Sequence, residues 1–396
     1  MLKRIAFFFI MLAIPVIGTV GLYYGYLALR GPQEGQTILV EPRGFLANNT
    51  YVRRFIYWLS RQHNWIAIDN GRKHIDKVIA GLVKEKGKDY RDNWAEALVF
   101  VPIPGVTGNH LPNVRGKYVN TNDLGYRSSL NFLAQIAEAR TLKAQGVRIA
   151  VFTGGSAGFG LYSDDDQTDI VGYLNQMAGA EGGRVRFYNF AMGSYTSAEE
   201  LNALVTYAAA LEPDLLIVFD GFNDALRLTE PAVYSVGVGV PFMYLSFRQG
   251  HAIAFQSEYL DRKYDLGQIT PEQQAEFFEH YQRNIRLMAR VMASGGGTTI
   301  VSTQPIGFFR SICNPPIVQS KLIDNFVKFY PKLIAAAREV SIAQRITYLD
   351  LTGLFEGPEE KCRGTFLDSV HMSSAGQKVV ADHLYAAVVK ALAAKS

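Results

Sequence analysis

The chain has 396 residues, of which 48% are hydrophobic and 19% charged, and its 40 basic and 36 acidic residues leave a formal net charge of +4. This composition is that of an ordinary globular protein and excludes wholesale disorder, and the length suffices for one large domain with appendages or for two domains. No basic stripe interleaved with aromatic residues occurs, which argues against a nucleic-acid partner.

The first thirty residues differ from the rest. Lys3 and Arg4 precede an uncharged apolar run from Ile5 to Leu29. This run is long enough to cross a bilayer, which takes about 20 residues, whereas the apolar region of a cleaved signal peptide spans about 7–15. We predict an uncleaved membrane anchor over residues 1–30, with a cleaved signal peptide as the alternative. The positive-inside rule then places the N-terminus in the cytoplasm and everything after Arg30 in the periplasm or outside the cell.

The next region, residues 31–120, shows a weaker pattern. The stretch YVRRFIYWLSRQHNW, from Tyr51, indicates a helix whose arginines face solvent or, as the alternative, lipid headgroups. The stretch VPIPGVTGNHLPNVRG, from Val101, is rich in proline and glycine and indicates irregular chain. We expect a partly helical region that leads from the anchor into the following domain.

From residue 121 onward, apolar runs alternate with helical patterns. Five runs resemble buried strands: VRIAVFTGG from Val147, VRFYNF from Val185, DLLIVFDG from Asp214, GTTIVSTQP from Gly297 and ITYLDL from Ile346. Helical patterns cover residues 164–180, 197–211, 271–293, 321–340 and 374–395. This alternation predicts an α/β three-layer sandwich over residues 121–396, with a mainly parallel five-stranded sheet. An apolar segment at about 228–268 interrupts it, and we expect an insertion that covers substrate, faces a membrane or forms a second packing cluster.

Glycines and polar residues gather where several of these segments end. Ser156 follows the first strand in GGSAGFG, Gly193 follows the second in NFAMGS, and Asn223 follows the third in GFND. A glycine-rich turn alone also suits phosphate binding. Near the carboxyl terminus, however, Asp368 and His371 stand three residues apart in DSVH, so that one turn can place them side by side. Because ligands bind at the carboxyl edge of open α/β sheets, we expect all these residues to meet there.

The chemistry of acyl transfer accounts for the set. Serine is a poor nucleophile unless a base takes its proton, and His371 is the candidate base for Ser156. Asp368 would fix the imidazole tautomer and stabilise the imidazolium that forms. The backbone N–H groups of Ser156 and Gly193 and the amide of Asn223 can donate to the oxyanion of a tetrahedral intermediate. We expect neither metal nor cofactor, since the seven histidines show no metal-ligand spacing.

The residues Ser156, Gly193, Asn223 and His371, in this order, resemble the sequence blocks of the SGNH hydrolase superfamily, also called GDSL esterases and lipases. The resemblance covers roughly residues 146–395. It implies a flavodoxin-like fold and metal-free ester hydrolysis or acyl transfer.

Two details refine the resemblance. Gly155 stands where the family's name-giving motif has aspartate, and the chain is similar in this to exported, membrane-anchored branches with GGS. The stretch NTNDLGYRS, from Asn120, resembles an Asn-x-x-Gly-x-Arg lead-in of some exported relatives, and we interpret it as a structural turn clamped by Arg127.

Other candidates lie nearby in the predicted fold. Gln304 and Arg310 follow the fourth strand and are in place to contact substrate. The two cysteines, Cys313 and Cys362, lie on the predicted exported side, where an oxidising compartment favours a disulfide over two unpaired thiols. The acidic segment SDDDQTD, from Ser163, suits a cation or, more commonly, the start of a helix.

Three functions fit these features. The leading hypothesis is an anchored, extracytoplasmic serine esterase that removes acyl groups, acetyl among them, from a cell-envelope glycan or a lipid-like ester. The alternative is an O-acyltransferase that uses the same triad to modify a sugar hydroxyl of an exported polysaccharide. A non-catalytic envelope scaffold on the same fold is disfavoured because all four site positions carry competent residues.

Overall fold

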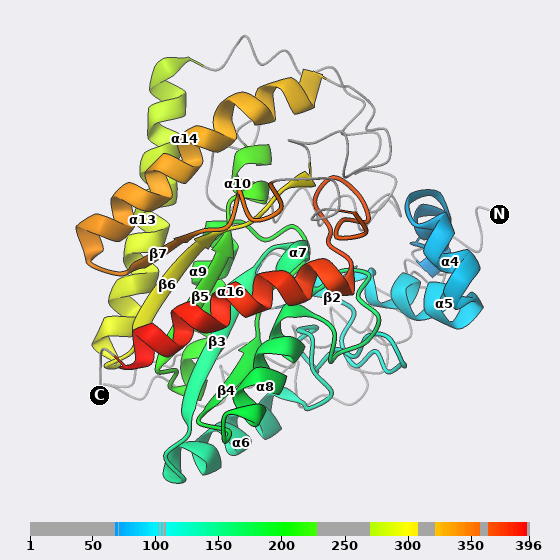
Figure 1. Ribbon diagram of the computed structural model, residues 1–396, viewed down its shortest axis with the longest axis horizontal. Helices are drawn as coiled ribbons and strands as arrows, with labels where there is room; N and C mark the ends of the chain where they lie inside the picture. Colours follow the sequence, from blue (N-terminus) through cyan, green and yellow to red (C-terminus); the bar gives the residue numbers. More distant parts are fainter. Residues whose placement is uncertain are drawn as a thin grey trace, which may run out of the picture. The chain divides into compact units, whose positions relative to one another are not determined.

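The computed structural model describes residues 68–69, 71–101, 103, 106, 108–227, 270–307, 321–356 and 363–393, which belong to one compact unit (Figure 1). The predicted anchor, the insertion at about 228–268, Arg310, Cys313 and Cys362 lie outside the described residues. Within the described ranges, no helix combines the length and the apolar character that a membrane span requires.

A parallel five-stranded sheet lies at the centre of the described chain. Its strands are β3 (Arg148–Gly154), β4 (Val185–Asn189), β5 (Leu215–Asp220), β6 (Thr298–Thr303) and β7 (Thr347–Asp350). Their order is β4-β3-β5-β6-β7, and every neighbouring pair is parallel, which confirms the predicted sheet. From β3 the chain goes to β4, which pairs with one edge of β3, and then crosses to β5, which pairs with the other edge. A topological switch point, where ligands bind in such sheets, therefore lies between β3 and β5.

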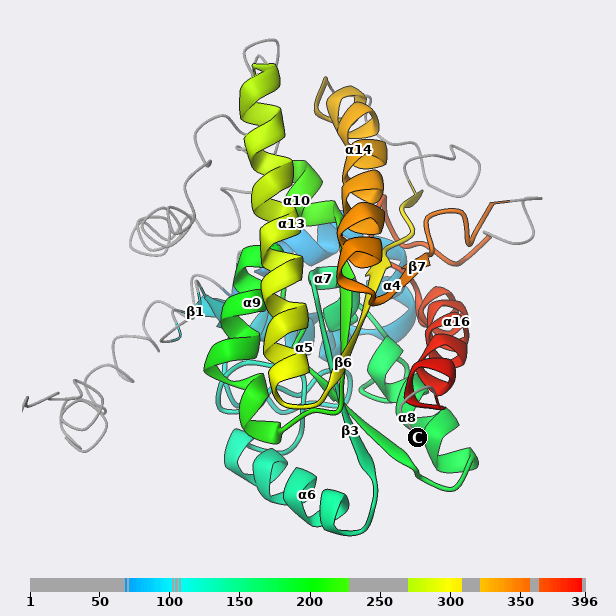
Figure 2. The same ribbon diagram turned by 90° about the vertical axis from the view of Figure 1, so that its left-hand side faces the viewer.

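Helices cover both faces of this sheet (Figure 2). On one face, α8 (Ile170–Ala180) and α16 (Ser374–Ala393) pack in a core that includes Phe152 and Phe219. The other face is covered by α6 (Phe132–Ala144), α9 (Ser197–Thr206), α13 (Pro271–Ser294) and α14 (Lys321–Gln344). Successive strand residues point to opposite faces, so a central strand covered on both sides needs the unbroken apolar runs seen in the sequence.

Side-chain caps set two helix boundaries that the apolar pattern does not reveal. The helix predicted from residue 164 begins only at Ile170, because Asp169 caps it by accepting the N–H of Gly172 at 2.5 Å. The pattern predicted over residues 197–211 divides into α9 and a short 3₁₀ helix, Ala208–Leu211. A capping box between Thr196 and Glu199 fixes the start of α9.

The described part of the region before residue 120 packs in the same core as the sheet. It contains α4 (Ala80–Lys86), α5 (Lys88–Ala97) and an antiparallel pair, β1 (Phe100–Val101) with β2 (Asn109–His110). Tyr90 and Trp94 of α5 are fully buried in the core that also holds Phe159. The Tyr90 hydroxyl donates to the carbonyl of Tyr162 at 2.8 Å. The region thus contacts the segment that directly follows Ser156.

Three carboxyl groups are buried on the α9 and α13 side of the sheet. They belong to Glu200 of α9, Asp220 at the end of β5 and Asp224 of α10 (Phe222–Arg227). Asp224 accepts the hydroxyl of Ser197 at 2.7 Å and the backbone N–H of Ser197 at 3.0 Å. Burial raises the pKa of all three groups, and the neighbouring carboxyl groups raise the pKa of Glu200 and Asp220 further. The fold therefore favours neutral carboxyl groups here.

We expect Glu200→Gln to stabilise the chain progressively as pH rises. An unfolded glutamate titrates near pH ~4.3, whereas burial and nearby carboxyl groups raise the pKa of Glu200 in the folded state. Wild-type stability therefore falls as pH rises from the unfolded pKa toward the folded pKa, and glutamine removes this loss. Melting temperatures of the two chains, measured from about pH 5 to about pH 8, should diverge with increasing pH. The exposed Glu279→Gln on α13 serves as the control, and a pH-independent difference for Glu200→Gln contradicts the prediction.

Candidate active site

Ser156 lies at the carboxyl end of β3, at the switch point of the sheet. It is the first residue of α7 (Ser156–Phe159), a four-residue helix that follows the two glycines at the end of the strand. A Cβ on Gly154 would lie 2.5 Å from the carbonyl oxygen of Phe219, and a Cβ on Gly155 would lie 2.5 Å from Nδ2 of Asn223. Glycine at position 154 therefore lets the β5 backbone approach the turn, and a side chain at position 155 would have to displace the Asn223 amide.

His371 and Asp368 lie in the loop before α16, far from Ser156 in the sequence, and the fold brings this loop next to Ser156. Nε2 of His371 is 2.9 Å from Oγ of Ser156, and Nδ1 of His371 is 2.6 Å from Oδ2 of Asp368. The second carboxylate oxygen, Oδ1, accepts the backbone N–H groups of Val370 at 2.8 Å and His371 at 2.7 Å. The loop thus folds around the carboxylate, and the predicted triad comes together.

The surroundings keep Asp368 ionised. Burial alone would raise its pKa, but the charge of His371 and the hydrogen bonds from His371 and Val370 outweigh burial and lower the pKa. A carboxylate at Oδ2 assigns the imidazole proton to Nδ1, which leaves the lone pair of Nε2 facing the Ser156 hydroxyl. Tyr162 packs edge-on against the imidazole, with the ring centroids 5.7 Å apart. The arrangement can remove a proton from Ser156.

Asn223 brings a side-chain amide to the same turn. It lies in the first turn of α10, after Gly221, whose φ of 120° only glycine adopts readily. Its Nδ2 donates to the carbonyl of Tyr195 at 2.8 Å. Nδ2 carries two N–H groups. Among the described residues, the Tyr195 carbonyl accepts one of them, and the other is available to a ligand. Its closeness to Gly155 places that donor beside the nucleophile turn.

Gly193 lies in the turn after β4, and its N–H already has a partner. It donates to Nε2 of His110, at 3.3 Å, from strand β2. Burial lowers the pKa of His110 to about 3, so the imidazole stays neutral and its nitrogen can accept. A Cβ on Gly193 would lie 2.7 Å from the ring of Phe100 and 3.0 Å from His110. The sequence did not single out His110, because an isolated histidine in an irregular stretch carries no pattern.

The remaining candidates fall into two groups. Gln304 follows β6 as predicted and its backbone N–H donates to the carbonyl of Asp220 at 3.1 Å, but its side chain is buried, with 2% of the residue exposed. Arg310 and the two cysteines lie outside the described residues. Where the chain is described, no group of three or more histidine, cysteine, aspartate or glutamate side chains is arranged to hold a metal ion.

The model of the GDSL-like lipase/acylhydrolase family matches residues 152–379, more than half of the chain, whereas no curated protein matches it. Similar solved structures include a GDSL-like lipase from Bacteroides thetaiotaomicron VPI-5482, at 15% identity and a TM-score of 0.39, covering 66% of this chain and 98% of that one. The lipase/acylhydrolase from Enterococcus faecalis is 20% identical, with a TM-score of 0.39 and coverage of 61% and 95%. The psychrotrophic esterase EstA from Pseudoalteromonas sp. is 16% identical, with a TM-score of 0.38 and coverage of 62% and 98%.

The family match runs from β3 into α16, so it includes the nucleophile turn, the ends of β4 and β5, and the loop that carries Asp368 and His371. The chain therefore belongs to the GDSL-like lipase/acylhydrolase family and is an ester hydrolase of that type.

Proposed function

We propose that the protein hydrolyses acyl esters through an acyl-enzyme formed on Ser156. The observation that carries the proposal is the hydrogen-bond chain from Ser156 through His371 to Asp368, at 2.9 and 2.6 Å. His371 takes the proton of the Ser156 hydroxyl as Oγ attacks the acyl carbonyl carbon, and returns it to the departing alcohol. Water, deprotonated by the same imidazole, then attacks the acyl-serine; the bond to Oγ breaks, the acid leaves, and His371 returns the proton to Oγ of Ser156. Asp368 stabilises the imidazolium in both steps.

The oxyanion of each tetrahedral intermediate needs donors that are already in place. We assign this role to the backbone N–H of Ser156 and to Nδ2 of Asn223, which lies beside the turn. The N–H of Gly193 donates to His110 in this structure. Gly193 can therefore donate to the oxyanion only if its N–H leaves His110 or is shared between His110 and the oxyanion. Each such donor is worth about 2.7–4 kcal/mol of transition-state stabilisation.

For the substrate we propose an acyl ester, acetyl included, of a cell-envelope glycan or a lipid-like molecule. The support is the uncharged apolar run from Ile5 to Leu29 behind Lys3 and Arg4, which favours an anchored protein with its site outside the cytoplasm. The GGS sequence at the nucleophile turn resembles that of exported branches of the family, which favours this location. Assay of the full-length chain on p-nitrophenyl acetate, with and without a glycan acceptor, tests the reaction. Free acetate in both assays supports hydrolysis, and acetyl transfer to the glycan would identify an O-acyltransferase instead.

We expect Ser156→Ala to lower kcat for p-nitrophenyl acetate by about 10⁴-fold or more, because the substitution removes the oxygen on which the acyl intermediate forms. The variant should also lose labelling by a fluorophosphonate, whose phosphorus is attacked by the serine oxygen with loss of fluoride. Circular dichroism should be unchanged. Ser294→Ala, at the exposed end of α13, is the matched control. A Ser156→Ala chain that retains turnover rules out this nucleophile.

Gly155→Asp introduces the family's name-giving aspartate, and we expect it to lower kcat about 10²–10³-fold. The new side chain would occupy the position of the Asn223 amide, which lies 2.5 Å from the Cβ site, and displace one oxyanion donor. Because the acyl group binds in the ground state without this donor, KM should change little. Gly179→Ala in α8, where a Cβ meets nothing within 4 Å, controls for loss of a glycine. Wild-type kcat in Gly155→Asp would show that the amide is not needed.

A further inference from the structure

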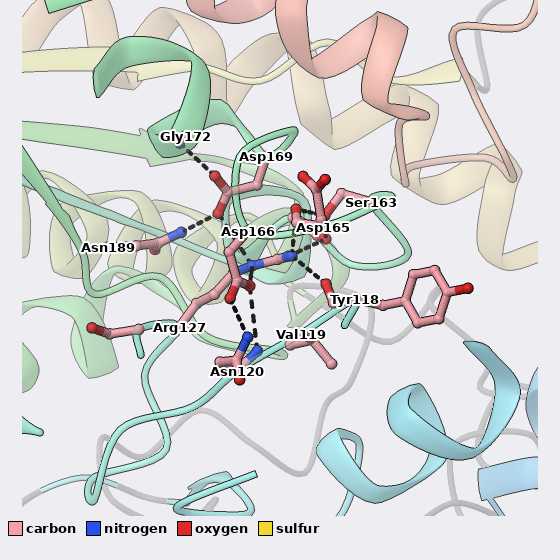
Figure 3. A network of polar contacts seen from close by, with 12 residues as sticks. Tyr118, Val119, Asn120, Arg127, Ser163, Asp165, Asp166, Asp169, Gly172 and Asn189 are labelled. Atoms are coloured by element: carbon pink, nitrogen blue, oxygen red, sulfur yellow. Dashed lines mark hydrogen bonds and ion pairs between the residues drawn. The ribbon is translucent and has the colours of Figure 1, made fainter. Parts of the chain in front are cut away.

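The side chain of Arg127 is buried beside the nucleophile turn, with 2% of the side chain exposed. A guanidinium has five N–H donors, and the structure provides an acceptor for each of them (Figure 3). Nε donates to Oδ1 of Asp166 at 2.8 Å; Nη1 donates to the carbonyls of Phe159 at 3.2 Å and Gly160 at 2.7 Å; Nη2 donates to the carbonyls of Tyr118 at 2.9 Å and Asp165 at 2.8 Å. Such complete pairing fixes the guanidinium in one orientation.

Two of these acceptors belong to the helix that starts with Ser156. The carbonyls of Phe159 and Gly160 stand at the end of α7, where the last turn of a helix leaves its carbonyls without helical partners. Gly160 ends the helix in the left-handed region, with φ of 78°, and the next N–H, that of Leu161, returns to the carbonyl of Ser156 at 3.1 Å. Arg127 therefore holds the end of a single turn whose beginning is the nucleophile.

The buried charge is offset locally. Asp166 pairs with Nε, and Oδ2 of Asp169 lies 3.4 Å from the same atom. The guanidinium carbon also lies 5.4 Å from the ring centroid of Trp94 and 5.8 Å from that of Phe159, distances typical of cation–π contacts. These rings come from α5 and α7, so the cation joins the region before residue 120 to the nucleophile turn.

The same segment reaches the histidine loop. Asp169 caps α8, and the next backbone N–H, that of Ile170, donates to Oε1 of Gln377 on α16 at 3.1 Å. Gln377 Nε2 donates to the carbonyl of Met372, the residue after His371, at 3.3 Å. The N–H of Asp164 donates to Oγ of Ser374 at 3.0 Å. The segment from Phe159 to Ile170 is thus hydrogen-bonded both to Arg127 and to the residues that follow His371.

We propose that Arg127 is a positioning residue for Ser156, which fixes the nucleophile turn and its separation from His371 so that the rate of acylation depends on the guanidinium fork. The proposal rests on the role of Ser156 in the proposed function. Lysine keeps the charge but supplies one ammonium in place of the planar fork, and it cannot bond Phe159, Gly160, Asp165 and Asp166 together. A displacement of about 1 Å at a reacting group costs about 100-fold in rate.

The test compares Arg127→Lys with wild type in the full-length chain. We expect kcat for p-nitrophenyl acetate and the rate of fluorophosphonate labelling to fall together by about 100-fold, with KM within about twofold. Arg186→Lys is the control, because Arg186 of β4 also pairs with a carboxylate, Glu138 at 3.4 Å, and stacks on Tyr188. In Arg127→Ala, guanidinium chloride at low millimolar concentration should restore part of the labelling rate, whereas sodium chloride should not.

Three outcomes separate the hypotheses. If folded Arg127→Lys is labelled at Ser156 as fast as wild type, the positioning role is wrong while the proposed function stands. If wild type is not labelled at Ser156, the proposed function itself fails. If Arg127→Lys does not fold, Asp166→Ala, which removes the partner of Nε and leaves Arg127 in place, should slow labelling about 3- to 10-fold, and an unchanged rate overturns the proposal.

Discussion

The site depends on the hydrogen bond of 2.9 Å between Nε2 of His371 and Oγ of Ser156, which joins residues 215 positions apart in the chain. Neither residue fixes that distance by itself, because Ser156 begins a four-residue helix and His371 lies in a loop. The frame is the parallel sheet, in which β3 is paired on both sides, and the core under α8 and α16 that the loop before α16 shares. Hydrophobic burial is non-directional, so it brings the segments together without setting their spacing. The polar contacts at the sheet edge have to supply the remaining precision.

The site also requires neighbouring segments to approach the turns after β3 and β4 closely, and three glycines at these turns leave room for them. Side chains at Gly154, Gly155 or Gly193 would collide with the β5 backbone, the Asn223 amide or the Phe100 ring, respectively. The family's aspartate at the second of these positions would occupy the space that the amide fills here. The close approach of Gly155 to the Asn223 amide ties the nucleophile turn to α10.

The sheet and the triad were predictable because both leave local signals. Unbroken apolar runs mark the strands, and the three-residue spacing of Asp368 and His371 marks a turn in which one side chain can orient the other. The start of α8 was not predictable from periodicity, since an N-cap at Asp169 decides it. His110 and the full role of Arg127 also escaped the sequence. Their partners are backbone groups, such as the N–H of Gly193 and the carbonyl of Gly160, and a backbone group has no residue type that a motif can record.

The two faces of the sheet bury different ionisable groups next to the site, a guanidinium on one face and three carboxyl groups on the other. On the α8 side, the guanidinium of Arg127 is balanced by aspartates and backbone carbonyls. On the α9 side, burial raises the pKa of Glu200, Asp220 and Asp224, and the neighbouring carboxyl groups raise the pKa of Glu200 and Asp220 further. Asp224 follows Asn223 directly on α10, whereas Arg127 holds the turn of Ser156. The carboxyl cluster therefore adjoins the amide donor of the site, whereas a buried guanidinium holds the end of the nucleophile turn.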